Sequence, residues 1–366
     1  MGKGDQGGRR RADLERGRRP TERNAPRVVA TAGRARPLVY VIGTGGSISN
    51  VGESRTDFID YGYAGKHYTI NEMLRRLPEI GAFADVRAEQ FLNVGSGDVS
   101  PDQWAGLARR VNAIFREDPA ATGIAITHGT ATLEDTAYFL NLTVKSGKPV
   151  VVTGAMRPMT ALSNDGEINL LDCVRVAASP AAAGRGVLVV LNNQIQAARE
   201  VTKTSTSRLE TFRSSDLGLL GYADSDGEVV FYRSPARTHT EQSEFDIGKV
   251  RKLPRVDIAL AYPGADGTAV SALARAGCAG MVAAGLGSGG APRAFLDALG
   301  EVAHSGVPVV IASQAGSGRV MARRVFTERG FVVADNLLPR KARILLMLAL
   351  TRTREPAEIQ RMMRTY

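Results

Sequence analysis

Cysteine is nearly absent from this sequence, since 366 residues contain only Cys173 and Cys278. The two lie far apart in apolar surroundings, with no C-x-x-C spacing and no Cys/His cluster of the kind that holds a metal ion. The pattern excludes a disulfide framework and predicts no metal site. We therefore expect both thiols to be buried core groups, as free cysteines commonly are.

Long hydrophobic runs are also missing. No window reaches the roughly 18 apolar residues that a membrane-spanning helix needs, and the basic N-terminal residues are not followed by the apolar segment of a signal peptide. These absences exclude a membrane-spanning protein and predict a cytoplasmic one with no membrane partner.

The positive charge is concentrated at one end of the chain. Residues 1–36 contain eleven Lys and Arg and four acids, a net charge of +7, which leaves +3 of the total +10 for residues 37–366. The first segment mixes Gly, Arg and Pro without period and predicts a disordered basic leader. It has no aromatic residue to stack on bases, so we expect no nucleic-acid partner.

The length predicts two domains, on a prior of about 100–200 residues per domain. In residues 37–233, short β-branched runs alternate with segments whose apolar residues recur at helical spacing. Ser100 followed by Pro101 is typical of a helix start. We expect strands at 38–42, 123–127, 149–153 and 186–191, and helices at 101–115, 133–146 and 166–178.

A polar, charged stretch at 234–254 predicts a linker, after which a second alternation begins at residue 255. Strands are expected at 256–261, 280–284 and 308–312, and helices at 269–276, 291–304 and 340–351. Strands that are apolar throughout and alternate with helices indicate parallel sheets covered on both faces. The predicted fold is α/β, with two α/β domains and mainly parallel sheets: a catalytic domain at 37–233 and a smaller one at 255–366.

The first segment that could carry chemistry is the Gly-rich turn GTGGS at residues 43–47, directly after a strand. A dinucleotide loop would need a third glycine where Ile48 stands. A purely structural turn remains open. The third interpretation is a loop whose glycines let backbone N–H groups approach a ligand while Ser47 presents a hydroxyl.

Two further segments are rich in hydroxyl groups. THGTATLEDT, at residues 127–136, follows a strand and leads into a helix, where α/β sheets bind ligands. His128 in it favours a structural role. The segment VTKTST, at 201–206, contains Lys203, which is either a solvated cation or an activating group with a pKa lowered by burial.

The order of these strings is more specific than any one of them. GTGGSI (43–48), THGTATLEDTAYFL (127–140), GAMRP (154–158), SNDG (163–166) with NL (169–170), VTKT (201–204) and the closing KARILL (341–346) occur in turn. Together they resemble the bacterial L-asparaginase family of amidohydrolases, over essentially all of residues 37–366. The resemblance implies two α/β domains and a homodimer or homotetramer in which each site borrows residues from a neighbouring subunit.

The resemblance also implies a role for the first Gly-rich loop. Its last hydroxyl residue is the family's nucleophile, normally threonine, and here it is Ser47; the swap keeps Oγ and drops the methyl that would restrict χ1. Thr44 is the structural hydroxyl. A lid tyrosine of the family hydrogen-bonds the nucleophile, and either Tyr61 or Tyr63 matches it, with Asp57 and Asp60 as nearby alternatives.

Other site residues follow in the same way. Ser96 matches the serine that holds the substrate's α-carboxylate, Thr130 the second catalytic threonine and Lys203 the lysine that supports it. The Gly45-Gly46 backbone or the Gly129-Thr130 turn is expected to stabilise the oxyanion. A hydroxyl nucleophile with a base and an oxyanion site needs no cofactor, so none is expected.

Three positions depart from the family pattern. Ala131 stands where an aspartate usually binds the substrate's α-ammonium group, Gly97 where glutamine is common, and Gly290 where a neighbouring subunit's asparagine often helps. All three serve the α-amino side of the substrate, whereas Ser47 and the Thr130 pair serve the scissile amide. We therefore expect amide cleavage or acyl transfer on a small carboxamide substrate that lacks a free α-amino group or carries an acylated one.

Two other interpretations of the resemblance stay open. The chain is an ordinary L-asparaginase if the ammonium group is bound by another acid, such as Asp98 or Asp60. Alternatively, it is a weakly active or inactive homologue that binds a metabolite, since both the carboxylate at 131 and the threonine at 47 have been lost.

Overall fold

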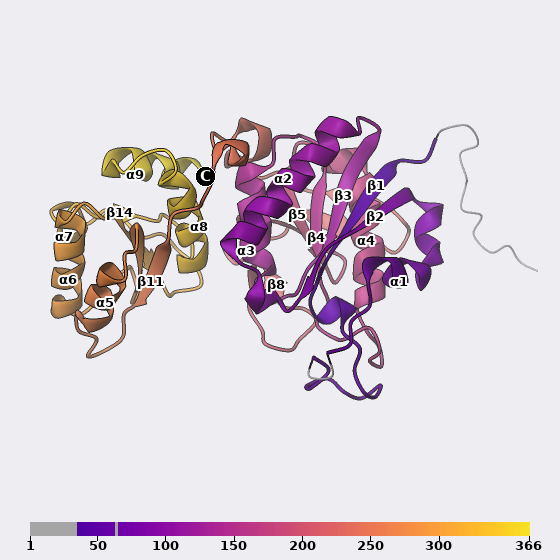
Figure 1. Ribbon diagram of the computed structural model, residues 1–366, viewed down its shortest axis with the longest axis horizontal. Helices are drawn as coiled ribbons and strands as arrows, with labels where there is room; N and C mark the ends of the chain where they lie inside the picture. Colours follow the sequence, from indigo (N-terminus) through magenta and orange to yellow (C-terminus); the bar gives the residue numbers. More distant parts are fainter. Residues whose placement is uncertain (1–34, 63–64) are drawn as a thin grey trace, which may run out of the picture. The chain divides into compact units, whose positions relative to one another are not determined.

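The computed structural model describes residues 35–62 and 65–366. All but the last two residues of the expected leader lie outside these residues, as does Tyr63. Eight strands form the larger of the sheets (Figure 1). They are β1 (Leu38–Gly45), β2 (Asp85–Val94), β3 (Ala121–Thr127), β4 (Val150–Thr153), β5 (Val187–Leu191), β6 (Gln194–Ala197), β9 (Gly221–Ala223) and β10 (Val229–Phe231).

Five neighbouring strands of this sheet, in the order β2-β1-β3-β4-β5, pair in parallel, and β6, β9 and β10 continue it in antiparallel pairing. The apolar parallel strands were predicted from the sequence, whereas the other strands were not. The edge strand β2 is rich in polar residues and shows no long apolar run. Strand β6 shows none either, and it returns from β5 through Asn192 and Asn193, both with positive φ.

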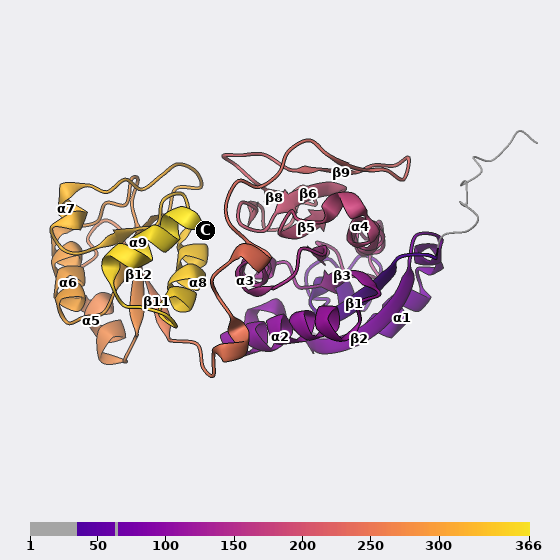
Figure 2. The same ribbon diagram turned by 90° about the horizontal axis from the view of Figure 1, so that it is seen from above.

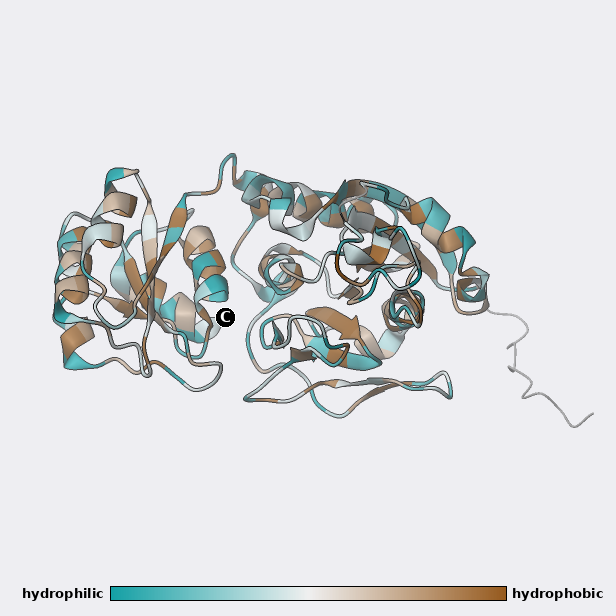
Figure 3. Ribbon diagram, turned by 90° about the horizontal axis from the view of Figure 1, so that it is seen from below, coloured by the Kyte–Doolittle hydropathy of each residue, from teal (hydrophilic) through white to brown (hydrophobic). Residues whose placement is uncertain are grey.

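Helices cover both faces of the large sheet, as Figure 2 shows. They are α1 (Ile70–Arg75), α2 (Pro101–Glu117), α3 (Leu133–Thr143) and α4 (Gly166–Ala178). Because side chains alternate along a strand, Ile124 and Ile126 pack with α2 and α3, whereas Ala125 packs with α1 and α4. Hydrophobic colouring accordingly follows the strands in Figure 3.

Local signals set the helix ends. Ser100 caps α2 in a reciprocal arrangement with Gln103, and Pro101 is its first residue, as expected. The helix expected at 133–146 ends at Thr143, because Val144 is already extended.

The second sheet has four parallel strands in the order β11-β12-β13-β14. Its strands are β11 (Val256–Leu260), β12 (Gly280–Gly285), β13 (Val309–Ser313) and β14 (Val332–Val333), and its helices are α5 (Thr268–Arg275), α6 (Arg293–His304), α7 (Arg324–Thr327), α8 (Pro339–Ala349) and α9 (Pro356–Thr365). One core cluster joins α5, α6 and α7 to this sheet, and another joins α8 and α9 to its opposite face. The predicted α/β class with two mainly parallel sheets is confirmed.

Helix α8 also packs against α3, so one hydrophobic cluster continues from the large sheet to the small one. Between the sheets, residues 234–254 contain two short 3-10 turns, Thr240–Gln242 and Ile247–Lys249. The domain boundaries at 233 and 255 remain predictions.

Both cysteines are free and buried, as expected. No helix within the described residues is long and apolar enough to cross a membrane. In the same part of the chain, no group of three or more His, Cys, Asp or Glu side chains could hold a metal ion.

Candidate active site

The candidate site lies at the carboxyl ends of three adjacent strands, β2, β1 and β3, where their following loops touch. Gly46 has φ 88°, and a Cβ on it would lie 2.1 Å from Gly129 Cα. A Cβ on Gly129 would in turn lie 2.6 Å from Ser96 Cβ. Only glycine fits such approaches, so Gly46 and Gly129 bring the loops of Ser47, Ser96 and Thr130 together.

Ser47 follows this contact in a short 3-10 turn, Ser47–Ser49. Its Oγ lies 2.9 Å from the hydroxyl of Tyr61. Of the two tyrosines proposed as partners, the structure therefore brings Tyr61 to Ser47, and Tyr63 lies outside the described residues. Thr44 is buried and donates to Thr127 O at 2.7 Å, a contact that ties β1 to β3.

The loop that carries Tyr61 is held at several points. Leu162 N–H donates to Arg55 O at 2.8 Å, and Gly52 N–H donates to the Thr160 hydroxyl at 2.9 Å. Asp57 is used inside the loop, where its carboxylate accepts the N–H of Asp60 at 2.9 Å. Tyr61 thus approaches Ser47 from a loop anchored to residues 160–162.

Thr130 and Lys203 form the second pair of the site. Lys203, on the short strand β7 (Thr202–Lys203), donates from Nζ to Thr130 Oγ1 at 2.8 Å. Burial lowers the pKa of Lys203, and the negative charge of Glu134 opposes this shift. Among the described residues, no carboxylate lies within 4.0 Å of Lys203 Nζ. The pair is therefore a hydroxyl and a partly desolvated amine without a directly bonded acid.

His128 holds the turn before Thr130 from inside the protein. The ring is fully buried, with Nδ1 2.9 Å from Gly129 O and Nε2 2.9 Å from the Thr136 hydroxyl. Because the carbonyl can only accept, Nδ1 donates to it and Nε2 accepts from Thr136. Burial lowers the pKa of His128 to about 4, so the ring is neutral at pH 7 and serves the structure of the turn.

The orientation of the Gly129 carbonyl determines where the neighbouring Thr130 N–H, a possible oxyanion donor, points. In a trans peptide the N–H points opposite to the C=O, so the Thr130 N–H points away from His128, and no acceptor for it lies among the described residues. The Gly46 N–H, by contrast, is already bonded to Val94 O at 3.0 Å. Of the two oxyanion donors that the sequence suggested, the Gly129-Thr130 turn has the available N–H.

Two of the three small residues are exposed, and the third is partly buried. Ala131 is exposed, and its carbonyl accepts from Arg340 Nη2 at 2.9 Å. Gly97 is exposed next to the exposed Asp98, and a Cβ on Gly97 would meet no atom within 4 Å. Gly290 belongs to the turn after β12 and forms an isolated bridge with Leu286 of the same turn; among the described residues, no hydrogen bond joins it to Ser47 or Thr130.

The charges behind Thr130 were not predicted from the sequence. Glu134 and Asp135, in the first turn of α3, are buried, and both are paired with Arg340. Burial raises the pKa of Asp135 to about 6, against the attraction of Arg340. A sequence signal existed, because two adjacent acids beside an apolar helix need a counter-charge when they are buried, but the partner lies 205 positions away in the chain.

These contacts define an arrangement suited to nucleophilic acyl chemistry. One hydroxyl, Ser47, is bonded to a tyrosine; a second, Thr130, is bonded to a lysine; and both lie beside glycine turns at the end of a parallel sheet. Such paired hydroxyls, each with its own proton acceptor, can activate first a side-chain nucleophile and then water.

Comparisons with known proteins agree with this class of chemistry. Residues 38–237 match the family model "Asparaginase, N-terminal", and residues 255–363 match "Glutaminase/Asparaginase C-terminal domain". The chain belongs to the asparaginase family of amidohydrolases. The predicted family and the prediction that the chain is an amide-cleaving enzyme are both confirmed at this level.

Its relatives cover nearly the whole chain. It is 40% identical to L-asparaginase 2 of Escherichia coli over 92% of this chain and 95% of that protein, and 40% identical to the glutaminase-asparaginase of Pseudomonas fluorescens over 90% of each. A solved structure from Campylobacter jejuni, described as a probable cytoplasmic L-asparaginase, is 39% identical with a TM-score of 0.84, and the match covers 90% of this chain and 100% of that one.

Proposed function

We propose that this enzyme cleaves a side-chain or terminal carboxamide, or transfers its acyl group, on a substrate without a free α-ammonium group. Ser47 is the proposed nucleophile and Tyr61 the group that takes its proton. Attack of Ser47 Oγ on the amide carbonyl forms an ester as the C–N bond breaks, and the nitrogen leaves as ammonia with the transferred proton. The Thr130 N–H is the proposed donor to the oxyanion.

The second half of the reaction is assigned to Thr130 and Lys203. With its pKa lowered by burial, the Lys203 amine can take a proton through the Thr130 hydroxyl as water attacks the acyl ester. The C–Oγ bond then breaks, the proton held by Lys203 passes back through the Thr130 hydroxyl to Ser47 Oγ, and the carboxylic acid product leaves. Ser96, buried against Gly129, is the proposed contact for a substrate carboxylate, and Gly46, Gly97, Asp98 and Ala131 are proposed to line the same substrate site.

The observation that carries the proposed specificity is the lack of a free acceptor beside residue 131. The methyl group of Ala131 accepts no hydrogen bond, and the nearest acids along the chain, Glu134 and Asp135, are already bound by Arg340. An ammonium group placed beside Ala131 would lose its hydration without gaining a carboxylate partner, whereas a neutral group would not carry that cost.

A second candidate is an ordinary L-asparaginase, favoured by the names of the relatives at 40% identity. In that case the exposed carboxylate of Asp98, next to Gly97, is the acid that receives the ammonium group. We also propose that the enzyme is a cytoplasmic homodimer or homotetramer, with the Gly290 turn of one subunit near a site of another.

The test is ammonia release from a set of ω-amides: L-asparagine, L-glutamine, N-acetyl-L-asparagine and succinamate. The proposal predicts turnover of succinamate or N-acetyl-asparagine in preference to asparagine, abolished by Ser47→Ala. Efficient turnover of free asparagine would favour the second candidate. No turnover of any amide, with binding retained, would indicate a metabolite-binding homologue.

A gain-of-function variant tests the specificity more directly. Ala131→Asp with Gly97→Gln restores the polar groups at two exposed positions, and the space at Gly97 is open. We expect asparagine turnover to rise in this double variant. Ala120→Asp with Gly81→Gln adds the same groups at two exposed positions away from the site, of which Gly81 has open space around it, and serves as the control. Equal activity of the two double variants would count against the explanation.

A further inference from the structure

Two consecutive side chains of α8, Arg340 and Lys341, reach from the C-terminal part of the chain to the backbone beside Thr130 and Lys203. Arg340 binds the turn that follows Thr130, and Lys341 binds the chain that leads into Lys203. Within residues 35–62 and 65–366, no carboxylate is hydrogen-bonded to the Thr130–Lys203 pair, so its geometry depends on the backbone on either side.

Arg340 makes three contacts with one turn of chain. Its Nη2 donates to Ala131 O at 2.9 Å and to the carboxylate of Asp135, and its Nη1 donates to Glu134 Oε1 at 3.0 Å. The planar guanidinium presents these donors in a rigid fork. The carbonyl it binds belongs to the residue next to Thr130, so the guanidinium fixes that peptide relative to the start of α3.

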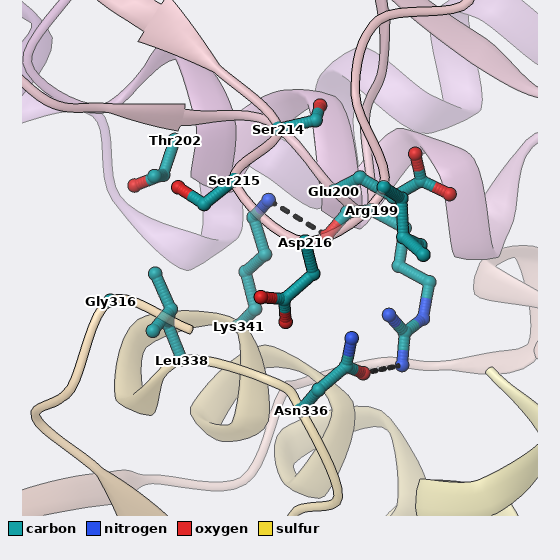
Figure 4. A pocket seen from close by; sticks show the side chains of 11 residues that line it. Arg199, Glu200, Thr202, Ser214, Ser215, Asp216, Gly316, Asn336, Leu338 and Lys341 are labelled. Carbon is teal, nitrogen blue, oxygen red and sulfur yellow. Dashed lines mark hydrogen bonds between the residues drawn. The ribbon is translucent and has the colours of Figure 1, made fainter. Parts of the chain in front are cut away.

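Lys341 likewise binds the backbone near Lys203, the other member of the pair. Its Nζ donates to Arg199 O at 2.9 Å, as Figure 4 shows, and also to Val201 O. Val201 is two residues before Lys203, so the ammonium group holds the backbone at the entrance to β7. The side chain is only 3% exposed, and burial lowers the pKa of Lys341 to about 8.

Burial of an ammonium group costs stability unless its hydrogen bonds compensate. An apolar side chain would pack against α3 at lower cost, but it would leave both carbonyls without a donor. The hydrogen bonds that Lys341 donates to the backbone at 199–201 therefore explain the buried lysine better than packing does.

We propose that Arg340 and Lys341 are positioning residues that set the Thr130–Lys203 hydrogen bond, so that α8 aligns the second half of the site. The inference rests on the proposed function, in which this pair activates water. Arg340 also adds a positive charge beside Glu134, the acid that acts on Lys203 electrostatically. Loss of Arg340 would therefore both loosen the turn and make the surroundings of Lys203 more negative.

The decisive variant is Arg340→Gln, because the Arg340 side chain is partly exposed and the melting temperature of the variant reports whether it folds. The matched control is Arg237→Gln. Arg237 likewise binds a buried carboxylate, Asp335 at 2.6 Å, and a backbone carbonyl, Arg364 O, but it touches neither Thr130 nor Lys203. Ammonia release from succinamate and from L-asparagine gives kcat and KM, and the melting temperature reports stability.

We expect Arg340→Gln to lower kcat roughly ten- to hundredfold, since small displacements of catalytic groups have effects of that size, with KM nearly unchanged. Its melting temperature should fall further than that of Arg237→Gln, because Glu134 and Asp135 lose their shared arginine whereas Asp335 keeps Arg319. Arg340→Lys, which retains the charge, should recover part of kcat. In a Thr130→Ala background, Arg340→Gln should change the residual kcat by less than about twofold, because groups that act through one another are not additive.

Three results would overturn the inference. One is a kcat for Arg340→Gln equal to that of Arg237→Gln. Another is a full, additive loss of kcat in the Thr130→Ala background, which would mean that Arg340 acts elsewhere. The third is an unchanged kcat in Thr130→Ala itself. That result would refute the proposed function of the Thr130–Lys203 pair as well as the inference, whereas the first two results would refute only the inference.

Discussion

Replacing Gly46 by alanine tests the contact on which the whole site is built. Gly46 has φ 88° and ψ −174°, a region that is essentially restricted to glycine and costs other residues on the order of 1–3 kcal/mol. The added Cβ would also lie 2.1 Å from Gly129 Cα and 2.4 Å from Gly129 N. Both close contacts are with backbone, so the two loops must separate.

The sum of strain and overpacking is about 2–6 kcal/mol, which for a chain of this size lowers the melting temperature by roughly 3–8 °C. Separation of the loops also moves Ser47 away from the Thr130 turn, so kcat should fall by more than the loss of stability explains. Thermal unfolding and ammonia release measure the two effects.

Gly97→Ala is the control for this experiment. A Cβ at Gly97 meets nothing within 4 Å, and its φ lies outside the left-handed region, so its effect on stability should stay within about 0.5 kcal/mol. If Gly46→Ala matched Gly97→Ala in both melting temperature and kcat, the close approach of the two loops would be refuted as the basis of the site.

Three further predictions concern single side chains. Tyr61→Phe removes the 2.9 Å contact to Ser47 Oγ and should lower kcat with little change in melting temperature; an unchanged kcat would exclude Tyr61 as the proton acceptor. Because burial lowers the pKa of Lys203 from 10.5, a rate that needs the free amine should rise with pH with a midpoint below 10.5, and Lys203→Met should lack that rise. His128 has a pKa of about 4 when folded and 6.5 as its ordinary value. The unfolded state therefore binds more protons between these values, and up to about 3 kcal/mol of stability should be lost as pH falls from 6.5 to 4. Urea unfolding of His128→Gln, which cannot take up that proton, should show a smaller loss over this pH range than the unsubstituted protein.

Much of the fold could be predicted because its signals are local. Apolar, β-branched runs such as 149–153 can be buried on both faces, and Ser100-Pro101 marks a helix start whatever lies around it. The edge strand β2 and the return strand β6 lacked such signals. Their pairing partners, rather than their own residues, make them strands.

The residues of the candidate site likewise differ in whether the local sequence could identify them. Ser47, Thr130 and Lys203 could be singled out because they stand in short ordered motifs, and the resemblance supplied their expected roles. The choice between Tyr61 and Tyr63 had no local signal, and it was the 2.9 Å contact that associated Tyr61 with Ser47. Arg340 went unnoticed because its partners lie more than 200 positions earlier in the chain.

The sequence alone therefore established the α/β class, the family motifs and the loss of polar groups at Gly97 and Ala131. These are properties of residue identity and short-range spacing, which need no folded context. Tertiary structure established which charges surround Thr130, because burial and long-range pairing are set only when α3, β7 and α8 pack together. That packing places Arg340 and Lys341 beside the backbone of the Thr130–Lys203 pair and binds Glu134 and Asp135 to Arg340.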